Sequence, residues 1–270
     1  MAAAGLLDVA REARGVVSGV GWLKDNSRFW LGGTDDRLPV PPLQLVRSST
    51  GTSSLAWLLH GGALAADSIS NILAKNGIDI RGFGSILDFG CGCGRVMRRW
   101  STLDAALHGC DYNRKSIAWC RQHLPFARFE VNELNPPLPY ADGLFDLVYA
   151  LSVFTHLPES SLVAWMREMG RVLKPGGSLI ISTHGEACLG GLTDEQRLQF
   201  RAGQAVVKDQ DAAGTNRCGV YVSEQYVRTR MTNGFRFVDF LPQGARGNPP
   251  QDLVLLRNQL ARPAADTASR

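Results

Sequence analysis

A run of three glycines, each separated from the next by one residue, is the part of this chain best suited to binding a ligand. Residues 85–95 read S-I-L-D-F-G-C-G-C-G-R, in which one residue separates Asp88 from the first glycine. The apolar residues before Asp88 predict a short buried strand, and residues 95–100 predict the N-terminus of a helix. Glycines in such a turn permit positive φ angles and let a ligand approach the backbone closely. The segment therefore predicts a site for a nucleotide-like ligand.

The glycine spacing excludes two common nucleotide-binding motifs. A dinucleotide fingerprint, G-x-G-x-x-G, would need a third glycine where Arg95 stands, and a phosphate loop would need a G-K-[ST] tripeptide, which the chain lacks. The pattern present is D-x-G-x-G-x-G. Asp88 would repel a pyrophosphate but suits the ammonium group of an amino-acid-like cofactor. We expect Asp88 to act through the geometry of the loop and ordered water, without direct contact.

Polar side chains lie at the ends of the next two predicted strands. In a doubly wound sheet, ligands bind at the carboxyl ends of the parallel strands. Asp111 ends one strand, about 20 positions after Asp88, which is the spacing at which an acidic residue binds ribose hydroxyls. Tyr112 is expected to cover one face of an adenine, and Asn132 to contact its edge. The strands predicted after the first one occupy residues 107–111, 129–132, 144–150 and 178–182.

With these segments in order, the chain resembles the class I S-adenosylmethionine-dependent methyltransferases. The resemblance is carried by L-D-F-G-C-G-C-G, Asp111, P-Y-A-D-G-L-F-D-L-V and L-K-P-G-G, within residues 84–183. It implies an α/β fold with a doubly wound, mostly parallel seven-stranded sheet whose last strand is antiparallel, and S-adenosyl-L-methionine as the cofactor. Residues 235–240 and 253–257 are expected to pair near one edge of that sheet. The residues expected to hold the cofactor are Asp88, Gly90, Cys91, Gly92, Asp111, Tyr112, Asn132, Glu133, Leu151 and Ser152.

Two histidines follow predicted strands at the ligand-binding edge. His156, in the segment after the fourth strand, has the titration range of a general base, with a midpoint near pH 6 to 7 if its pKa is unperturbed. The alternatives are a pocket wall without proton transfer, or a structural role beside Pro158. His184 follows the fifth strand and is expected to contact substrate, unless it only neighbours the turn at Gly185. Glu186 is a weaker candidate for a second catalytic group.

Three short sequence segments restrict the resemblance to a smaller group of methyltransferases. F-G-C-G-C-G-R, S-V-F-T-H-L and S-T-H-G-E together look like bacterial methyltransferases found beside glycosyltransferases and natural-product enzymes. Gln251-Asp252 matches the end of the W-x-x-H-Q-D segment of that family, whereas residues 246–250 do not match its beginning. The leading hypothesis is therefore methyl transfer to a small molecule, at a hydroxyl oxygen of a natural product or glycan. The alternatives are an N-methyltransferase, another S-adenosylmethionine-binding enzyme on the same fold, or a binding protein with a degenerate site.

The chain is expected to divide into a cap and a core. Residues 1–75 are predicted to form an N-terminal helical cap, and residues 76–258 the cofactor-binding core. Within the core, residues 185–234 break the strand pattern and are expected to form a helical insertion that roofs the substrate pocket. Residues 259–270 are small and polar, so we expect a disordered tail.

Composition favours an enzyme that acts on small molecules. The chain has 270 residues and a net charge of +4, without a basic tract for nucleic acid or an apolar run long enough for a membrane. The N-terminus lacks the pattern of a secretory signal. Six cysteines include no C-x-x-C pair, so we expect reduced thiols in the cytoplasm and no metal site. The expected state is a monomer or homodimer with no nucleic-acid or membrane partner.

Overall fold

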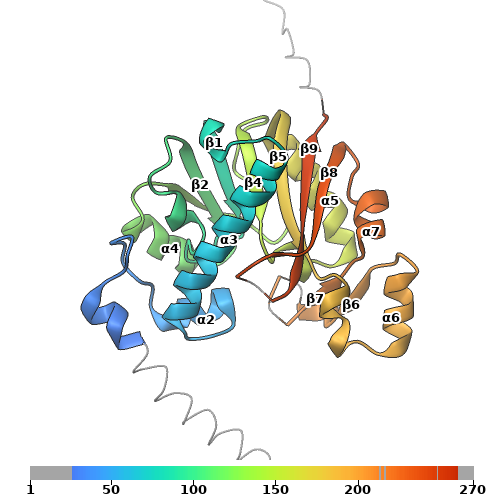
Figure 1. The fold of residues 1–270 in the computed structure, drawn as a ribbon, viewed down its shortest axis with the longest axis horizontal. Coiled ribbons are helices and arrows are strands. Elements are labelled where there is room, and N and C mark those ends of the chain that lie inside the picture. The colour runs from blue at the N-terminus through green and yellow to red at the C-terminus, as the bar shows by residue number, and fades with distance from the viewer. Residues whose placement is uncertain (1–25, 213, 216, 248, 261–270) are drawn as a thin grey trace, which may run out of the picture.

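A seven-stranded sheet lies at the centre of the computed structural model, which describes residues 26–212, 214–215, 217–247 and 249–260 (Figure 1). The strand order is β3-β2-β1-β4-β5-β9-β8, and β9 runs antiparallel to both of its neighbours. This confirms the expected doubly wound, mostly parallel sheet and the pairing of the last two strands at its edge. The strands are β1 (Ser85–Phe89), β2 (Ala106–Asp111), β3 (Arg128–Val131), β4 (Phe145–Ala150), β5 (Leu173–Thr183), β8 (Phe235–Ala245) and β9 (Gln251–Asn258).

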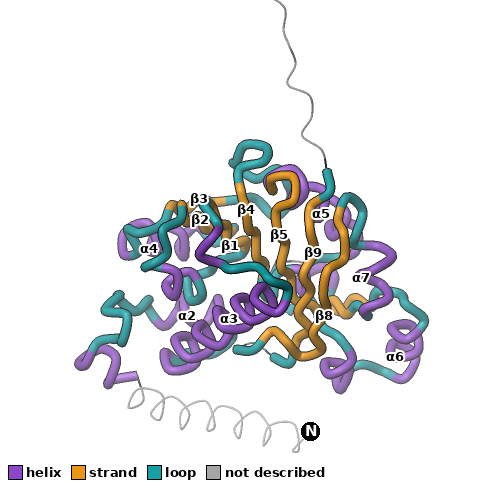
Figure 2. The backbone as a smooth tube through the Cα atoms, turned by 45° about the horizontal axis from the view of Figure 1, so that its top comes forward, coloured by secondary structure: helices purple, strands orange, loops and turns teal. Residues whose placement is uncertain are grey.

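Helices cover both faces of the sheet, which explains why its central strands carry apolar residues on both faces. In β4, Leu147 and Tyr149 face one apolar cluster, and Val148 and Ala150 face the other. The first cluster includes residues of α3 (Leu55–Lys75) and α4 (Arg114–His123). The second includes residues of α5 (Glu159–Val172) and α7 (Glu224–Arg230). Figure 2 shows α3 crossing in front of the sheet.

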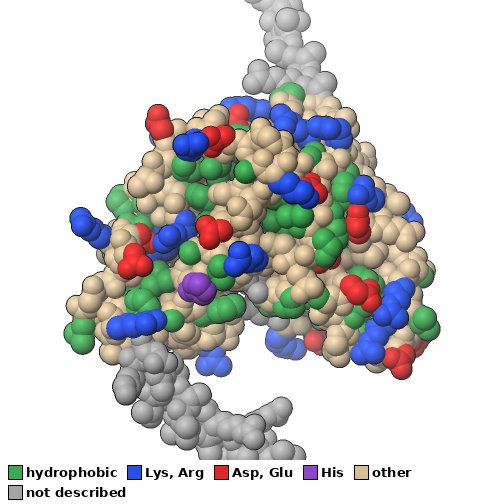
Figure 3. Space-filling model, in the orientation of Figure 1, with side chains coloured by type: hydrophobic (Ala, Val, Ile, Leu, Met, Phe, Trp, Pro, Cys, Tyr) green, Lys and Arg blue, Asp and Glu red, His purple; other side chains and the backbone are tan. Residues whose placement is uncertain are grey.

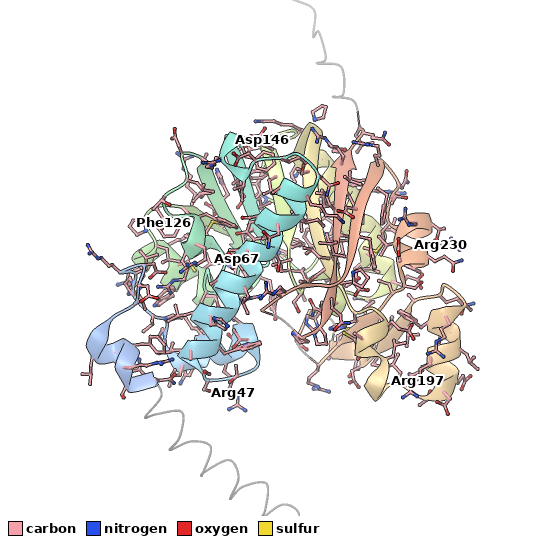
Figure 4. All side chains as sticks on the ribbon, viewed as in Figure 1. Arg47, Asp67, Phe126, Asp146, Arg197 and Arg230 are labelled. Carbon is pink, nitrogen blue, oxygen red and sulfur yellow. The ribbon has the colours of Figure 1, made fainter. Side chains whose placement is uncertain are left out.

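The carboxyl ends of the parallel strands point toward the N-terminal segment and the insertion. In Figure 4, Asp146 marks the end of the sheet where β4 begins. Arg47 of α2 (Leu43–Thr50) and Arg197 of α6 (Asp194–Arg201) lie at the opposite end. These two segments therefore flank the edge at which doubly wound folds bind their ligands.

The helix predicted to begin at residue 95 is only a four-residue 3-10 helix, η2 (Met97–Trp100). The turn that leads into it contains one α-helical hydrogen bond, in which the Arg98 amide donates to the Gly94 carbonyl at 3.0 Å. The next residues, S-T-L-D, form turns. Serine, threonine and aspartate bond locally to the backbone and so compete with helix formation.

The expected helical insertion also contains a small antiparallel sheet. Strands β6 (Val206–Lys208) and β7 (Gly219–Tyr221) pair with each other beside α6. Their sequences, V-V-K and G-V-Y, are rich in β-branched and aromatic residues, which favour strands. The last helix of the expected insertion, α7, packs on the main sheet instead, because Val227 is buried in the apolar cluster on that face.

The N-terminal segment that the structure describes is helical, with one helix at residues 26–32 and α2 following. Residues 1–25 of the predicted cap and 261–270 of the predicted tail lie outside the described residues. None of the helices in the described part of the chain has the length and apolarity needed to cross a bilayer.

A buried ion pair joins this segment to the core, and breaking it is expected to destabilise the fold. The Arg98 side chain, only 1% exposed, donates through Nε and Nη2 to the Asp36 carboxylate. Asp36→Ala would leave the guanidinium with only its carbonyl contacts to residues 38 and 39. We expect the free energy of unfolding to fall by about 3 kcal/mol, measured by urea denaturation. Asp104→Ala, at an exposed acid, is the matched control and should leave the midpoint unchanged.

Candidate active site

A cavity of about 420 Å³ opens at the carboxyl ends of the central strands, where the chain order reverses between β1 and β4. The glycine turn after β1, the ends of β2 and β3, and the loop after β4 line it. Residues 48–51 of the N-terminal segment and Gly214 of the insertion lie on its rim. Figure 3 shows the molecule hollowed at this end, between the parts that carry α2 and β6.

The glycine turn forms the floor of this cavity, and its conformation requires glycine. Gly90, Gly92 and Gly94 have φ angles of 78°, 53° and 70°. A Cβ on Gly90 would lie 2.3 Å from Cγ2 of Val153, and one on Gly92 would lie 2.7 Å from Oγ of Ser49. The turn therefore brings the backbone to the cavity surface without side chains in the way.

The acid at the end of β2 is bonded to the glycine turn. Asp111 is buried, and its Oδ2 accepts a hydrogen bond from the Gly92 amide at 2.9 Å. Its Oδ1 accepts from the Asn113 amide at 2.7 Å. Burial raises the pKa of this carboxyl, and the two amide hydrogen bonds oppose that shift. Asp111 and the half-exposed Tyr112 both line the cavity beside the turn.

An acceptor atom without a protein partner lies at the end of β3. The Asn132 side chain is buried and lines the cavity, and its Nδ2 donates to the Glu133 carbonyl at 2.7 Å. Its Oδ1 has no hydrogen-bond partner. A buried carbonyl oxygen is costly to leave unbonded, so this atom suits a donor group of a ligand.

Asp88 lies behind the cavity wall instead of lining it. Its buried carboxyl is hydrogen-bonded by Tyr149, and burial raises its pKa to about 7. The positive charge of Arg95 opposes this rise. Arg95 itself lines the cavity and donates from Nη1 to the Gly61 carbonyl at 3.3 Å and the Gly247 carbonyl at 3.4 Å. Sequence reasoning missed Arg95 as a site residue, although it directly follows the last glycine of the motif.

The two candidate catalytic histidines meet in this cavity, with ring centroids 6.0 Å apart. His156 belongs to the 3-10 helix η3 (Phe154–His156). Its Nδ1 lies 2.6 Å from the Cys218 carbonyl oxygen and therefore carries the proton. Its Nε2 is left as an acceptor, 3.5 Å from Oγ of Ser152. Burial lowers the pKa of His156, which favours the neutral ring.

His184 is bonded at both ring nitrogens. Its Nδ1 lies 3.2 Å from the Val220 carbonyl oxygen, and its Nε2 lies 3.2 Å from Nε2 of Gln251. Burial and the neighbouring His156 lower the pKa of His184 to about 4. Glu186, the weaker candidate for a second catalytic group, does not line the cavity. Its carboxylate is well exposed and pairs with Arg201 at 2.8 Å.

Part of this chain matches a known family. Residues 86–177 match the family described as "Methyltransferase domain". This confirms the resemblance to the class I S-adenosylmethionine-dependent methyltransferases that the motifs predicted, and it supports the expected cofactor.

Curated relatives and solved structures agree with the methyltransferase domain. Methyltransferase GfsG of Streptomyces halstedii is 32% identical over 113 residues, which are 39% of each chain. The 27-O-demethylrifamycin SV methyltransferase of Amycolatopsis mediterranei is 32% identical over 38% of this chain and 40% of its own. The chain thus matches about two fifths of the length of these relatives. An S-adenosylmethionine-dependent methyltransferase of Mesorhizobium loti shares the fold, with a TM-score of 0.54 and 18% identity over 71% of this chain and 98% of its own.

The segment matched as a methyltransferase domain contains only part of the cavity lining. The glycine turn, Asp111, Asn132 and His156 fall inside residues 86–177. His184 and Gln251, together with the contributions of α2 and the insertion, fall outside it. Sequence reasoning did not identify Gln251 as a site residue, although Gln251-Asp252 was the surviving end of a family segment.

Proposed function

We propose that this chain transfers the methyl group of S-adenosyl-L-methionine to a hydroxyl oxygen of a small molecule, with His156 as the general base. The observation that carries this proposal is the continuity of one cavity. The glycine turn, Asp111 and the open acceptor of Asn132 lie in the same cavity as the unprotonated Nε2 of His156. A bound cofactor and a bound acceptor would therefore share this cavity with the proposed base.

The residues at the Asp111 side of the cavity suit the adenosine part of the cofactor. Asp111 would accept from the ribose hydroxyls, and Tyr112 would cover the adenine ring. Oδ1 of Asn132, which lacks a protein partner, would accept from the adenine amino group. These roles use a carboxylate, an aromatic face and an amide oxygen, each matched to the part of adenosine that it would contact.

The glycine turn and Arg95 suit the amino-acid part. The backbone at Gly90, Cys91 and Gly92 can approach a ligand closely, and the Arg95 guanidinium offers a positive charge for a carboxylate. Leu151 and Ser152, on the loop after β4, also line the cavity. The bound sulfonium supplies an activated methyl group, so the protein has mainly to position the acceptor and exclude water.

His156 is suited to take the proton that a hydroxyl acceptor must lose. Because the Cys218 carbonyl holds the proton on Nδ1, the lone pair of Nε2 is exposed to the cavity. As the acceptor oxygen forms its bond to carbon and the sulfur–carbon bond breaks, the hydroxyl proton passes to Nε2. The proton then leaves to solvent, and the products are the methyl ether and neutral S-adenosylhomocysteine.

The acceptor side of the cavity favours an uncharged small molecule. Trp57, Val153, Leu157 and Pro249 contribute apolar surface to the cavity. Lys and Arg side chains are interspersed with Asp and Glu on the face drawn in Figure 3, which does not favour a nucleic-acid substrate. Curated relatives named as a ubiquinone biosynthesis O-methyltransferase and a 27-O-demethylrifamycin SV methyltransferase support a hydroxyl acceptor on a small molecule, which we propose is a natural product or glycan. We keep a monomer or homodimer as the expected state.

Calorimetry followed by an acceptor screen tests this function. Purified protein should bind S-adenosyl-L-methionine with one site per chain, and NAD should not compete. A panel of phenols, sugars and macrocyclic alcohols, with matched amines, should then be screened for release of S-adenosylhomocysteine. Binding of NAD alone would overturn the cofactor assignment. Release with amines but not with alcohols would overturn the oxygen acceptor.

A further inference from the structure

Gln251, the first residue of β9, connects three cavity residues from separate parts of the chain. Its side chain is fully buried. Its Nε2 donates to Oγ of Ser152 at 3.0 Å and lies 3.2 Å from Nε2 of His184. Its Oε1 accepts from the Ser182 hydroxyl at 2.8 Å. Both the NH₂ group and the carbonyl oxygen of this amide are therefore hydrogen-bonded.

The direction of these hydrogen bonds follows from a backbone carbonyl in the insertion. The Val220 carbonyl can only accept, so Nδ1 of His184 carries the proton and its Nε2 must accept. Only the NH₂ group of Gln251 can donate to that Nε2, which directs Oε1 toward Ser182. Because the Ser182 Oγ accepts from the Ser152 amide at 2.7 Å, its own proton is available for Oε1. One arrangement of protons thus satisfies all five groups, which are the Val220 carbonyl, the His184 ring, the Gln251 side-chain amide, the Ser182 hydroxyl and the Ser152 backbone amide.

The same arrangement orients the hydroxyl of Ser152. Its Oγ accepts from Gln251, so its own proton points elsewhere. The two neighbours within reach are Oγ1 of Thr155 at 3.4 Å and the bare Nε2 of His156 at 3.5 Å. Ser152 has a φ of 59°, an unfavourable angle for a non-glycine residue. A strained backbone at a cavity residue indicates that surrounding contacts hold it in place.

We infer that Gln251 is a positioning residue: its amide holds His184 as an uncharged acceptor and orients the Ser152 hydroxyl beside His156, so that His156 alone takes up the acceptor proton. This inference rests on the proposed function for its catalytic half. Its structural half, the uncharged state of His184, can be measured without any acceptor. The insertion takes part as well, because carbonyls two residues apart, at Cys218 and Val220, set the tautomers of both histidines.

The two carboxylates near His184 are each engaged with another group, and its other neighbours are aromatic rings. The ring centroid of His156 on η3 is 6.0 Å away, and Tyr221 of β7 packs on His184 with centroids 5.0 Å apart and ring planes tilted by 34°. Asp252 of β9 accepts from the Gln243 amide and lies against Gly185. Glu186 is paired with Arg201 at the surface. The low pKa of His184, about 4, agrees with this environment.

Imidazole NMR on wild type and two variants tests the inference. The chain has only five histidines, so long-range nitrogen–proton spectra can resolve each tautomer. In the wild type, His184 should be protonated only at Nδ1 and titrate near pH 4. Gln251→Glu replaces the donor with a carboxylate, so His184 should gain a proton at Nε2 and its midpoint should move above about 6.5. Gln251→Met should lower turnover at least about tenfold and leave the affinity for S-adenosyl-L-methionine within about twofold.

Gln259→Glu, at the exposed residue just after β9, is the matched control and should alter neither the titration nor turnover. A wild-type His184 that titrates near pH 6.5, or that carries its proton on Nε2, would overturn the inference even if Gln251→Met failed to fold. Wild-type turnover and pH profile in a folded Gln251→Met would also overturn it. If no acceptor is methylated while His184 titrates near pH 4, the proposed function fails and the assignment of Gln251 to His184 stands.

Discussion

Replacing His156 with alanine is expected to lower turnover by about 10²- to 10⁴-fold, the usual contribution of a general base. The affinity for S-adenosyl-L-methionine should barely change. His156 lies on η3, apart from the glycine turn and from Asp111, which would hold the cofactor. The check is a comparison of kcat in stopped assays with the Kd of the cofactor from calorimetry.

The pH dependence of the wild-type rate provides an independent test of the same role. A base works when it is unprotonated, so the rate should rise with pH through the pKa of His156 and then level off. Because burial lowers that pKa, the midpoint should lie below the ordinary value of about 6.5. The sequence alone placed the midpoint near 6 to 7, since it could not reveal how deeply the ring is enclosed.

His60→Ala is the matched control for this prediction. His60 is exposed on α3 and should be replaceable without loss of turnover. A folded His156→Ala protein with full turnover and the wild-type pH profile would remove His156 from the chemistry. Positioning by the cavity alone would then be the better account of the rate.

Asp111→Ala should weaken binding of S-adenosyl-L-methionine by roughly 1–3 kcal/mol, because charge-assisted hydrogen bonds to the ribose would be lost. The same substitution removes the acceptors for the Gly92 and Asn113 amides. The glycine turn would then lose its tie to β2. Calorimetry on the folded variant measures the change, and turnover at saturating cofactor should fall less than the affinity.

Two further variants separate the ribose contact from the folding role of Asp111. Asp111→Asn keeps the shape and one acceptor oxygen, so it should retain more affinity than the alanine variant. Asp67→Ala, at an exposed acid of α3, removes one negative charge elsewhere and should leave the affinity unchanged (Figure 4). Unchanged affinity in Asp111→Ala would show that the ribose assignment is wrong.

The proposed cofactor end of the cavity could be predicted from the sequence because its determinants are local. Positive φ at Gly90, Gly92 and Gly94 is a property of a few adjacent residues. Buried parallel strands are apolar on both faces, so β1 and β4 stand out as short apolar runs. Asp111 then lies one connecting segment and one strand further along the chain. The absence of a full helix after residue 95 was not apparent, because the sequence pattern of its first turn is helical.

Only part of the proposed catalytic end could be predicted from the sequence. His156 and His184 were found because each follows a strand, and parallel strands end at the same edge of the sheet. Their tautomers depend on carbonyl groups of the insertion, 62 positions after His156 and 36 after His184. Backbone carbonyls have no sequence signature, since every residue has one. Val220 belongs to β7 and Cys218 directly precedes this strand, in a segment that was expected to be helical.

The sequence by itself determined the family, the sheet and the cofactor, because these depend on short segments whose chemistry is fixed by residue type and spacing. Only the tertiary structure decided which histidine has a lone pair open to the cavity. That distinction depends on Gln251, 67 positions from His184 and 99 from Ser152. It also depends on burial, which lowers the pKa of both rings. Long-range hydrogen bonds and desolvation exist only once the chain has folded.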